Sequence, residues 1–340
     1  MELTSVEICT GAGGQALGLE KAGFAHNAVV EIDQHACQTL RHNRPTWNVI
    51  EADLHGWDPT GYEGVDLLAG GVPCPPFSKA GRQLGGDDER DLFPVALNLV
   101  EAINPKAVML ENVRGLLDPK FADYRAGVEK RLSRNYQVAW RLLNASDFGV
   151  PQLRPRVIMV AIRNDQGVFS WPEPDVPPVT VGKALGKLMG QNGWEGARDW
   201  ARQANKVAPT LVGGSKKHGG PDLGPTRARA AWAALGVDGR TIAEEAPPAG
   251  FTGVPRLTVE MAARLQGFPA DWHFVGRKTH AYRQVGNAFP PPVAEAVGLQ
   301  IAQAITSASG RIRRRRELDA IAEAAVEVPR KPRKSKRDVA

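Results

Sequence analysis

Short apolar runs alternate with segments of helical periodicity through the first half of the chain. The apolar runs predict strands at 5–9, 27–33, 65–71, 106–113, 136–145 and 156–163. The intervening segments predict helices at 15–24, 34–43, 92–103 and 121–135. Strands separated by helices indicate βαβ units, in which helices cover both faces of a mainly parallel sheet. We therefore expect an α/β, Rossmann-like fold.

This alternation stops at the proline-rich segment 171–180, WPEPDVPPVT. The chain then stays rich in Gly, Pro, Lys and Arg until helical periodicity returns at 257–268 and 290–309. The pattern predicts three regions. A larger domain comprises 1–170 and 280–310, a smaller irregular domain covers 171–279, and a tail covers 311–340.

Charge is concentrated in that tail. The 340 residues carry a net charge of +6, and residues 311–340 hold 11 Lys or Arg against 5 Asp or Glu. The other 310 residues carry equal numbers of each sign. Such basic runs suit a polyanionic partner, although a solvated tail that only aids solubility has the same composition.

Several classes of protein are disfavoured by what the chain lacks. It has no apolar run of membrane-spanning length, and its first residues do not form a secretory signal. Its three cysteines predict no disulfide framework, and no clustered Cys or His spacing predicts a metal site. We expect a protein of a reducing compartment, with no membrane span and no metal.

A glycine-rich turn follows the first predicted strand. Gly11, Gly13 and Gly14 allow a close approach of the backbone to a ligand. Glu31 ends the second strand, where a carboxylate accepts hydrogen bonds from ribose, and Asp53 ends a third element. These residues predict an adenosine-type cofactor. The last glycine of the dinucleotide motif is missing, so a cofactor without phosphate fits as well.

Reactive side chains follow two other strands. Cys74 lies between prolines just after the strand at 65–71, where ligands bind in such folds. A rigidly held thiol beside a glycine-rich loop suits a nucleophile, whereas Cys9 and Cys37 fit buried apolar positions. Glu111 ends the strand at 106–113, where burial favours a carboxyl that donates a proton.

The segment QLRPR alternates polar and other residues. In an extended segment, Gln152, Arg154 and Arg156 point to one face. Charges of this kind also occur on exposed edge strands, which they protect from pairing with another chain.

These features together resemble the DNA (cytosine-5)-methyltransferases of bacterial restriction-modification type. The similarity spans residues 5–294, nearly all of the chain except the tail. It implies the Rossmann-like methyltransferase fold, a mixed sheet with helices on both faces. The matching blocks, in the order of the family, are EICTGAGG at 7–14, EID at 31–33, DL at 53–54, GGVPCPPFS at 70–78, ENV at 111–113, QLRPR at 152–156, RLTVEMAARLQGFP at 256–269 and QVGNAFPPPVA at 284–294.

The resemblance implies a catalytic group of Cys74, Glu111, Arg154 and Arg156. Cys74 adds to C6 of a cytosine that is flipped out of the duplex, and Glu111 activates the base at N3. The two arginines hold the cytosine O2 or nearby negative charge. The loop 75–90 closes over DNA.

The resemblance also implies S-adenosylmethionine as methyl donor and S-adenosylhomocysteine as product. Cys9 and Ile32 depart from the family, which often carries aromatic residues there, so the adenine site is differently filled. The implied cofactor-binding residues are Cys9, Gly11, Gly13, Gly14, Glu31, Ile32, Asp53, Leu54, Pro73, Leu92, Asn287 and Ala288.

Double-stranded DNA is the implied partner. We expect it to be bound at a short palindromic site, with 171–279 as the target-recognition domain. A paired restriction endonuclease, a monomeric state and a place in the bacterial cytoplasm, on the nucleoid, are further expectations. The implied DNA-binding residues are Ser78, Lys79, Arg82, Gln152, Thr210, Leu211, Lys216, Lys217, His218, Arg227 and Arg229.

Three other functions are consistent with parts of the sequence. A tRNA methyltransferase of the same fold is disfavoured because ENVRGLLDPK lacks a Cys-Phe-Thr continuation. A catalytically inactive DNA-binding protein is disfavoured by the intact Cys74 and Glu111. A dehydrogenase accounts for the glycine turn but leaves Cys74 and Arg156 unexplained.

Overall fold

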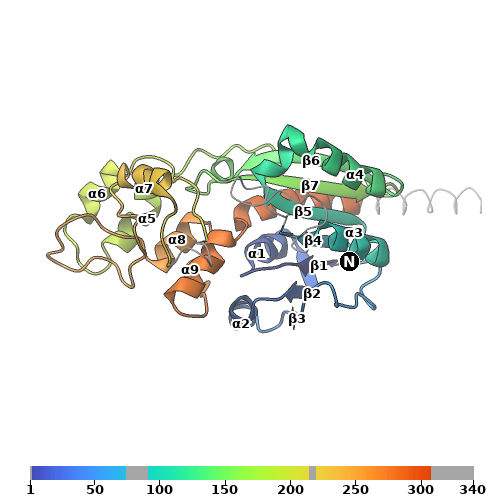
Figure 1. Cartoon of the computed structure of the whole chain (residues 1–340), viewed down its shortest axis with the longest axis horizontal. Helices are drawn as coiled ribbons and strands as arrows, with labels where there is room; N and C mark the ends of the chain where they lie inside the picture. Colours follow the sequence, from blue (N-terminus) through green and yellow to red (C-terminus); the bar gives the residue numbers. More distant parts are fainter. Residues whose placement is uncertain (1, 74–90, 214–219, 308–340) are drawn as a thin grey trace, which may run out of the picture.

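A mixed seven-stranded sheet forms the centre of the larger part of the molecule (Figure 1). The structure is a computed structural model that describes residues 2–73, 91–213 and 220–307. The strand order is β3-β2-β1-β4-β5-β7-β6. The strands are β1 (Leu3–Ile8), β2 (Phe24–Glu31), β3 (Val49–Glu51), β4 (Leu67–Gly70), β5 (Ala107–Val113), β6 (Tyr136–Asn144) and β7 (Pro155–Arg163).

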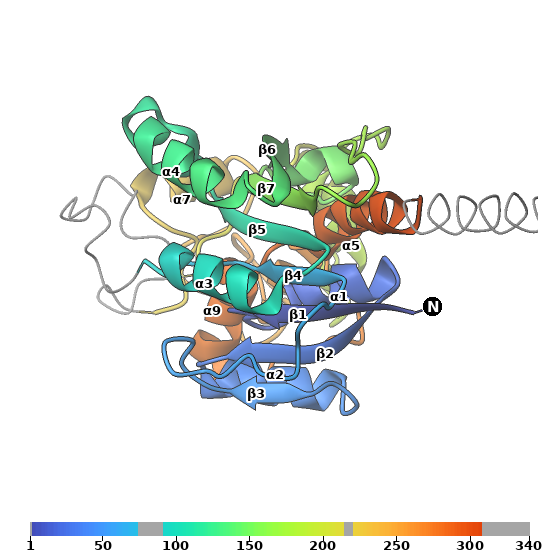
Figure 2. The same cartoon turned by 90° about the vertical axis from the view of Figure 1, so that its right-hand side faces the viewer.

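Helices cover both faces of this sheet (Figure 2). Val6 and Ile8 of β1 pack with α3 on one face, and Leu19 and Phe24 pack with the helical segment 291–307 on the other. The helices of this part are α1 (Gly14–Lys21), α2 (Gln34–Asn43), α3 (Phe93–Ile103) and α4 (Ala122–Leu132). The predicted α/β alternation is thus confirmed.

The first five strands in this order pair with one another in parallel. β7 runs antiparallel to both β5 and β6, which the apolar runs did not reveal. The parallel strands β1, β2, β4 and β5 therefore end at the same edge, and their following loops meet there. Ligands bind at this edge in open α/β sheets.

Short helices form a second cluster, away from the sheet (Figure 1). Trp200 and Trp232 are buried in its core, which continues into Leu17 of α1 and Leu40 of α2. The helices of this cluster are α5 (Val181–Met189), α6 (Ala197–Gln203) and α7 (Thr226–Ala233). Two further helices, α8 (Val259–Leu265) and α9 (Lys278–Asn287), lie between the cluster and the sheet.

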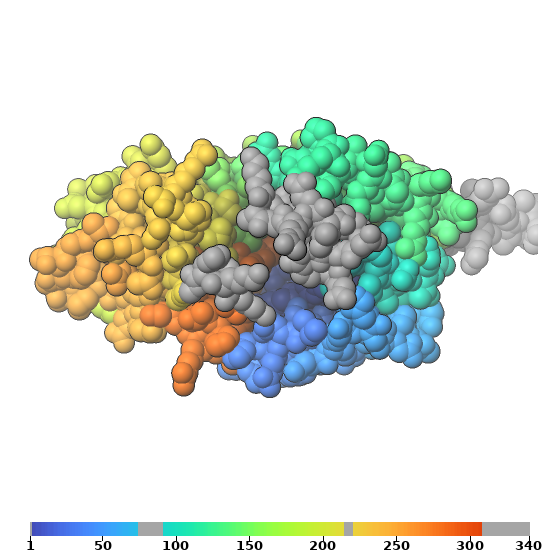
Figure 3. Space-filling model, viewed as in Figure 1, coloured from blue at the N-terminus to red at the C-terminus, as the bar shows by residue number. Residues whose placement is uncertain are grey.

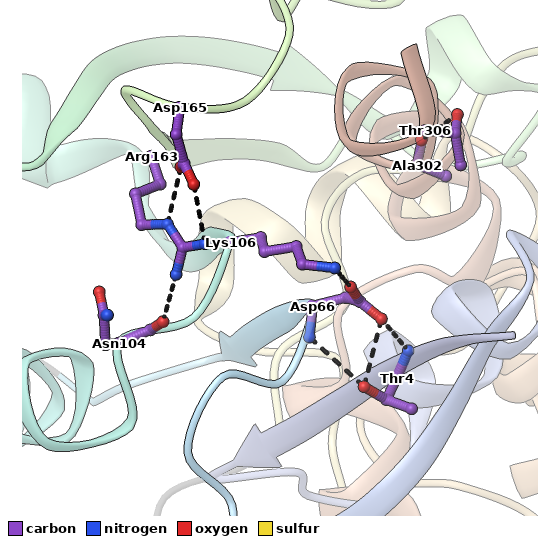
Figure 4. Close-up of polar contacts among 8 residues, drawn as sticks. All are labelled: Thr4, Asp66, Asn104, Lys106, Arg163, Asp165, Ala302 and Thr306. Carbon is purple, nitrogen blue, oxygen red and sulfur yellow. Dashed lines mark hydrogen bonds and ion pairs between the residues drawn. The ribbon is translucent and has the colours of Figure 1, made fainter. Parts of the chain in front are cut away.

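Asp66 connects three segments at the opposite, amino-terminal edge of the sheet (Figure 4). Its carboxylate accepts hydrogen bonds from the Thr4 backbone N–H at 2.7 Å and from the Thr4 hydroxyl at 3.2 Å. Lys106 Nζ lies 2.6 Å from the other oxygen, and the Asp66 side chain is only 10% exposed. Asp165, which pairs with Arg163 nearby, is 57% exposed.

Asp66→Ala should therefore lower the free energy of unfolding by about 2–4 kcal/mol, because buried charge-assisted donors lose their acceptor. The matched control Asp165→Ala should cost less than about 1 kcal/mol, since its ion pair is largely solvated. Urea unfolding followed by tryptophan fluorescence measures both. An equal loss of unfolding free energy in the two variants would show that the Asp66 contacts stabilise the fold no more than an exposed ion pair does.

Candidate active site

A cavity of about 300 Å³ opens at the carboxyl-terminal edge of the sheet. In the space-filling view the deep-blue N-terminal segment lies recessed between the orange segment that includes α9 and the paler blue one (Figure 3). Of the residues predicted to bind a cofactor, those that line the cavity are Cys9, Gly11, Glu31, Ile32, Asp53, Leu54, Pro73, Leu92, Asn287 and Ala288.

The glycine turn forms one wall of this cavity. Gly11 and Gly13 have φ values of 57° and 87°, and Cys9 adopts a similar φ of 50° without being glycine. A Cβ on Gly13 would lie 2.8 Å from both Leu40 and Trp272, and one on Gly14 would overlap the Phe289 carbonyl oxygen. Glycine is thus required at 13 and 14 by close packing, although neither residue lines the cavity itself.

Glu31 is held rigidly at the end of β2. Its carboxylate accepts hydrogen bonds from the backbone N–H groups of Gly11 at 2.6 Å, Asp33 at 2.8 Å and Ile32 at 2.9 Å. Burial raises its pKa, and these donors lower it in part. A carboxylate has about four acceptor positions, so at least one stays free for a ligand hydroxyl.

The rim beyond Glu31 is more open. Ile32 is 65% exposed although it lines the cavity, and Leu54 is buried. Asp53 is exposed and holds both the backbone N–H and the ring of His55 through Oδ1. This end therefore offers an apolar surface beside a carboxylate, without an aromatic ring at 9 or 32.

Glu111 lines the cavity and pairs with Arg156. Arg156 Nε lies 2.7 Å from Glu111 Oε1, and both side chains are more than four-fifths buried. Burial raises the pKa of Glu111, whereas the charges of Arg156 and Arg154 lower it. The neighbouring Asn112 donates to the Val72 carbonyl at 3.0 Å, which positions the segment that leads to Cys74.

Arg154 is separated from this cavity in a buried network. Arg154 is 1% exposed, and its guanidinium donates at 2.8 Å to the carbonyl oxygens of Leu211 and Gly286.

Gln152 is also buried. Its side chain accepts a hydrogen bond from the Leu211 N–H and donates one to the Leu265 carbonyl. The Thr210 hydroxyl donates to the Leu153 carbonyl. The side chains of three predicted ligand-contacting residues, Gln152, Arg154 and Thr210, thus bind the protein backbone, and a fourth, Leu211, contributes its backbone to this network.

The remaining predicted DNA contacts divide into two groups. Arg227 is exposed and Arg229 half-buried at the start of α7. The others lie outside the described residues, as do the predicted nucleophile Cys74 and the tail 311–340: they are Ser78, Lys79, Arg82, Lys216, Lys217 and His218.

Sequence reasoning missed several polar residues of the cavity lining. Glu7 and Gln15 are almost fully buried, and none of their side-chain oxygen or nitrogen atoms has a hydrogen bond of normal geometry. Burial raises the pKa of Glu7 well above its usual value, which the Ala16 N–H offsets only in part. An acid inside the apolar run 5–9 was the available signal. The other polar lining residues missed are Thr10, Asp33 and, in α9, His280, Arg283 and Gln284.

Two findings concern other kinds of site. In residues 2–73, 91–213 and 220–307, no group of three or more His, Cys, Asp or Glu side chains could hold a metal ion. Over the same ranges, no helix is long and apolar enough to cross a membrane.

Glu7→Gln should raise the melting temperature, and the gain should grow with pH. The raised pKa of the folded state means that ionisation of Glu7 in the unfolded chain removes stability as pH rises above about 4.5. Each kcal/mol recovered corresponds to roughly 2 °C. Thermal unfolding of both proteins at pH 5 and pH 8 measures the effect, and an equal difference at the two pH values would refute it.

Arg154→Met should lower the free energy of unfolding by about 2–4 kcal/mol, because two buried carbonyl oxygens lose their donor. Arg141→Met is the matched control, since Arg141 forms a 3.4 Å pair with a Glu173 that is 82% exposed. Urea titration monitors both variants. A loss below about 1 kcal/mol for Arg154→Met would mean that water replaces the guanidinium.

Comparison with known proteins identifies the chemistry. Residues 3–303 match the family model for C-5 cytosine-specific DNA methylase. The Type II methyltransferase M.NaeI of Lentzea aerocolonigenes is 58% identical over 311 residues, which cover 89% of this chain and 75% of the relative. The Type II methyltransferase M.NgoMIV of Neisseria gonorrhoeae is 56% identical over 311 residues, which cover 90% and 99%.

The fold has solved counterparts as well. The S. pombe Dnmt2 methyltransferase aligns with a TM-score of 0.60 at 17% identity, over 88% of this chain and 99% of that one. This likeness shows the fold alone, and it confirms the Rossmann-like methyltransferase architecture. The family model and the two relatives go further: this chain belongs to the C-5 cytosine-specific DNA methylases, which use S-adenosylmethionine as methyl donor.

Proposed function

We propose that Cys74, Glu111 and Arg156 carry out methyl transfer to C5 of a cytosine in double-stranded DNA. The observation that supports this most is the buried Glu111–Arg156 pair, whose carboxyl group lines the cavity. Asn112 fixes the backbone at Val72, two residues before Cys74. The acidic group of Glu111 therefore lines the cofactor cavity, and its neighbour Asn112 holds the backbone two residues before the predicted nucleophile.

The residues in the cavity fit S-adenosylmethionine. Glu7, Gln15, His280 and Arg283 contribute buried polar atoms without hydrogen-bond partners, which a polar ligand could satisfy. Glu31 has a free acceptor position for ribose, and Asp53 and Leu54 offer a polar and an apolar contact for adenine. When bound, the cofactor supplies an electrophilic methyl group on a sulfonium.

Cytosine C5 is a poor nucleophile, and the proposed residues correct this. The Cys74 thiolate adds to C6, and Glu111 donates a proton or a hydrogen bond to N3, which places electron density on C5. After C5 has gained the methyl group, loss of its proton expels the thiolate and restores the ring. A thiol suits both steps because it is nucleophilic and leaves readily.

The Glu111–Arg156 pair has a role in the timing of proton transfer. Burial raises the pKa of Glu111, which favours the protonated acid, while Arg156 opposes this as long as the two are paired. A cytosine that enters the site offers its O2 to Arg156 and its N3 to Glu111. When Arg156 binds the cytosine O2 instead of Glu111, the Glu111 carboxyl loses its paired cation and becomes a better proton donor to N3.

The remaining assignments concern the protein's partners. We propose that 171–279 recognises a short DNA site, that 1–170 with 280–310 holds the cofactor, and that the basic tail 311–340 strengthens DNA binding. The two relatives are named as Type II methyltransferases, which supports a role beside a restriction endonuclease. A monomer suffices for this chemistry, and we place it in the bacterial cytoplasm, on the nucleoid.

The test is methylation of a plasmid by the purified protein, read by bisulfite sequencing and by mass spectrometry of the nucleosides. We expect 5-methylcytosine at one position of a short recurring site. Cys74→Ala should reduce transfer by on the order of a thousandfold or more, and Glu111→Gln by about a hundredfold or more. Cys37→Ala, in α2 and outside the cavity lining, is the matched control.

Methylation at N4 of cytosine or at adenine would overturn the proposed reaction. Ordinary turnover by Cys74→Ala would instead overturn only the choice of nucleophile.

A further inference from the structure

Helix α9 presents a polar stripe to the cofactor cavity. His280, Arg283 and Asn287 all line it, and their spacing places them on one face of the helix. The Nε atom of Arg283 and the Nδ1 atom of His280 are buried and lack a hydrogen-bond partner. Buried guanidinium donors are costly to leave unpaired, so this stripe indicates a ligand that supplies acceptors.

The charges of the cavity are unequal. Five carboxyl groups line it, whereas Arg283 is the one Lys or Arg among its described lining residues. S-adenosylmethionine has the matching distribution: a sulfonium, an ammonium and a single carboxylate. The carboxyl-rich lining suits the two cationic groups, and the carboxylate requires a cation. The five carboxyl groups are those of Glu7, Glu31, Asp33, Asp53 and Glu111.

The position of Arg283 is set by packing on both sides of it. The adjacent Gln284 accepts a hydrogen bond from the Thr39 hydroxyl at 2.6 Å and donates to the Val275 carbonyl at 2.8 Å. One turn earlier, the His280 ring stacks on His35 at 4.2 Å with an interplanar angle of 9°. The helix is thus fixed against α2, and the guanidinium is held at the cavity wall.

We propose that Arg283 binds the α-carboxylate of the methionine part of S-adenosylmethionine. This rests on the proposed cofactor site, in which Glu31 and Asp53 hold the adenosine half and Asn287 lies one turn from Arg283 on the same stripe. A guanidinium forms two parallel hydrogen bonds with a carboxylate, which orients the ligand as well as attracting it. Arg283 then fixes the far end of the methionine chain, so that the sulfonium is oriented toward Glu111.

The test compares two ligands by isothermal titration calorimetry without DNA. One is S-adenosylmethionine and the other is its decarboxylated form, which keeps the sulfonium and the amine but lacks the carboxylate. We expect the wild-type protein to bind the first about 10- to 100-fold more tightly, as a charge-assisted pair implies. Arg283→Gln should abolish this preference and leave the affinity for the decarboxylated ligand unchanged.

Arg277→Gln is the matched control, because Arg277 is an exposed cation at the start of the same helix and does not line the cavity. It should retain the wild-type preference, and thermal unfolding should show that both variants are folded. Arg283→Lys keeps the charge but not the paired donors, so it should retain part of the preference.

Two results would overturn the assignment. An Arg283→Gln protein that still prefers the carboxylate form excludes the contact, and a loss of DNA affinity in that variant would then assign Arg283 to a phosphate. If Arg283→Gln lowers the affinity for both ligands equally, Arg283 only supports the fold. A wild-type protein that binds neither ligand would count against the cofactor site itself, which is a separate failure.

Discussion

The buried guanidinium of Arg154 is the contact on which the geometry of the site depends. It joins three distant segments, because it stands before β7 and binds the carbonyl oxygens of Leu211 and Gly286. Gly286 lies so close to Gly213 that a Cβ on it would come within 2.5 Å of the Gly213 Cα atom. Two residues further along β7, Arg156 faces Glu111. One buried guanidinium thereby links the end of α9 to the segment that leads into the Glu111–Arg156 pair.

Buried carboxyl groups that lower the stability of the fold when they ionise are concentrated at the carboxyl-terminal edge of the sheet. Burial raises the pKa values of Glu7, Glu31 and Glu111, so each carboxylate destabilises the protein when it ionises there. Such groups gather at functional sites, where a ligand supplies the missing charge. A cofactor with two positive groups offsets this cost on binding. The acidity that weakens the fold therefore contributes to affinity for the methyl donor.

Much of the fold follows from simple patterns, and some of it does not. Continuous apolar runs identified the parallel strands β1, β2, β4 and β5, because both faces of such strands are buried, but they missed the short parallel strand β3. The antiparallel placement of β7 depends on contacts between distant segments, which periodicity does not record. The alternation of Gln152, Arg154 and Arg156 lies only partly in a strand, because β7 begins at Pro155 and the first two residues precede it. Both of these side chains are buried, and they approach each other to 3.5 Å.

The site was predictable where local chemistry and strand ends coincide. Glu31 and Glu111 terminate strands, and the structure places both in one cavity. Arg283 and His280 had no such signal, because only the packing of α9 against α2 shows which face of that helix meets the cavity. Glu7 was hidden for the opposite reason, since an acid within an apolar strand resembles an ordinary exposed position of an amphipathic one.

The central claim is that one cavity brings a cytosine between a thiol at 74 and the carboxyl of Glu111. It is tested most directly with duplex DNA that carries 5-fluorocytosine at the methylated position, in the presence of S-adenosylmethionine. Fluorine cannot leave C5 as a proton does, so the adduct persists after methyl transfer. The account predicts a stable complex in which peptide mass spectrometry finds the base attached to Cys74. The absence of an adduct, or attachment to another residue, would contradict it.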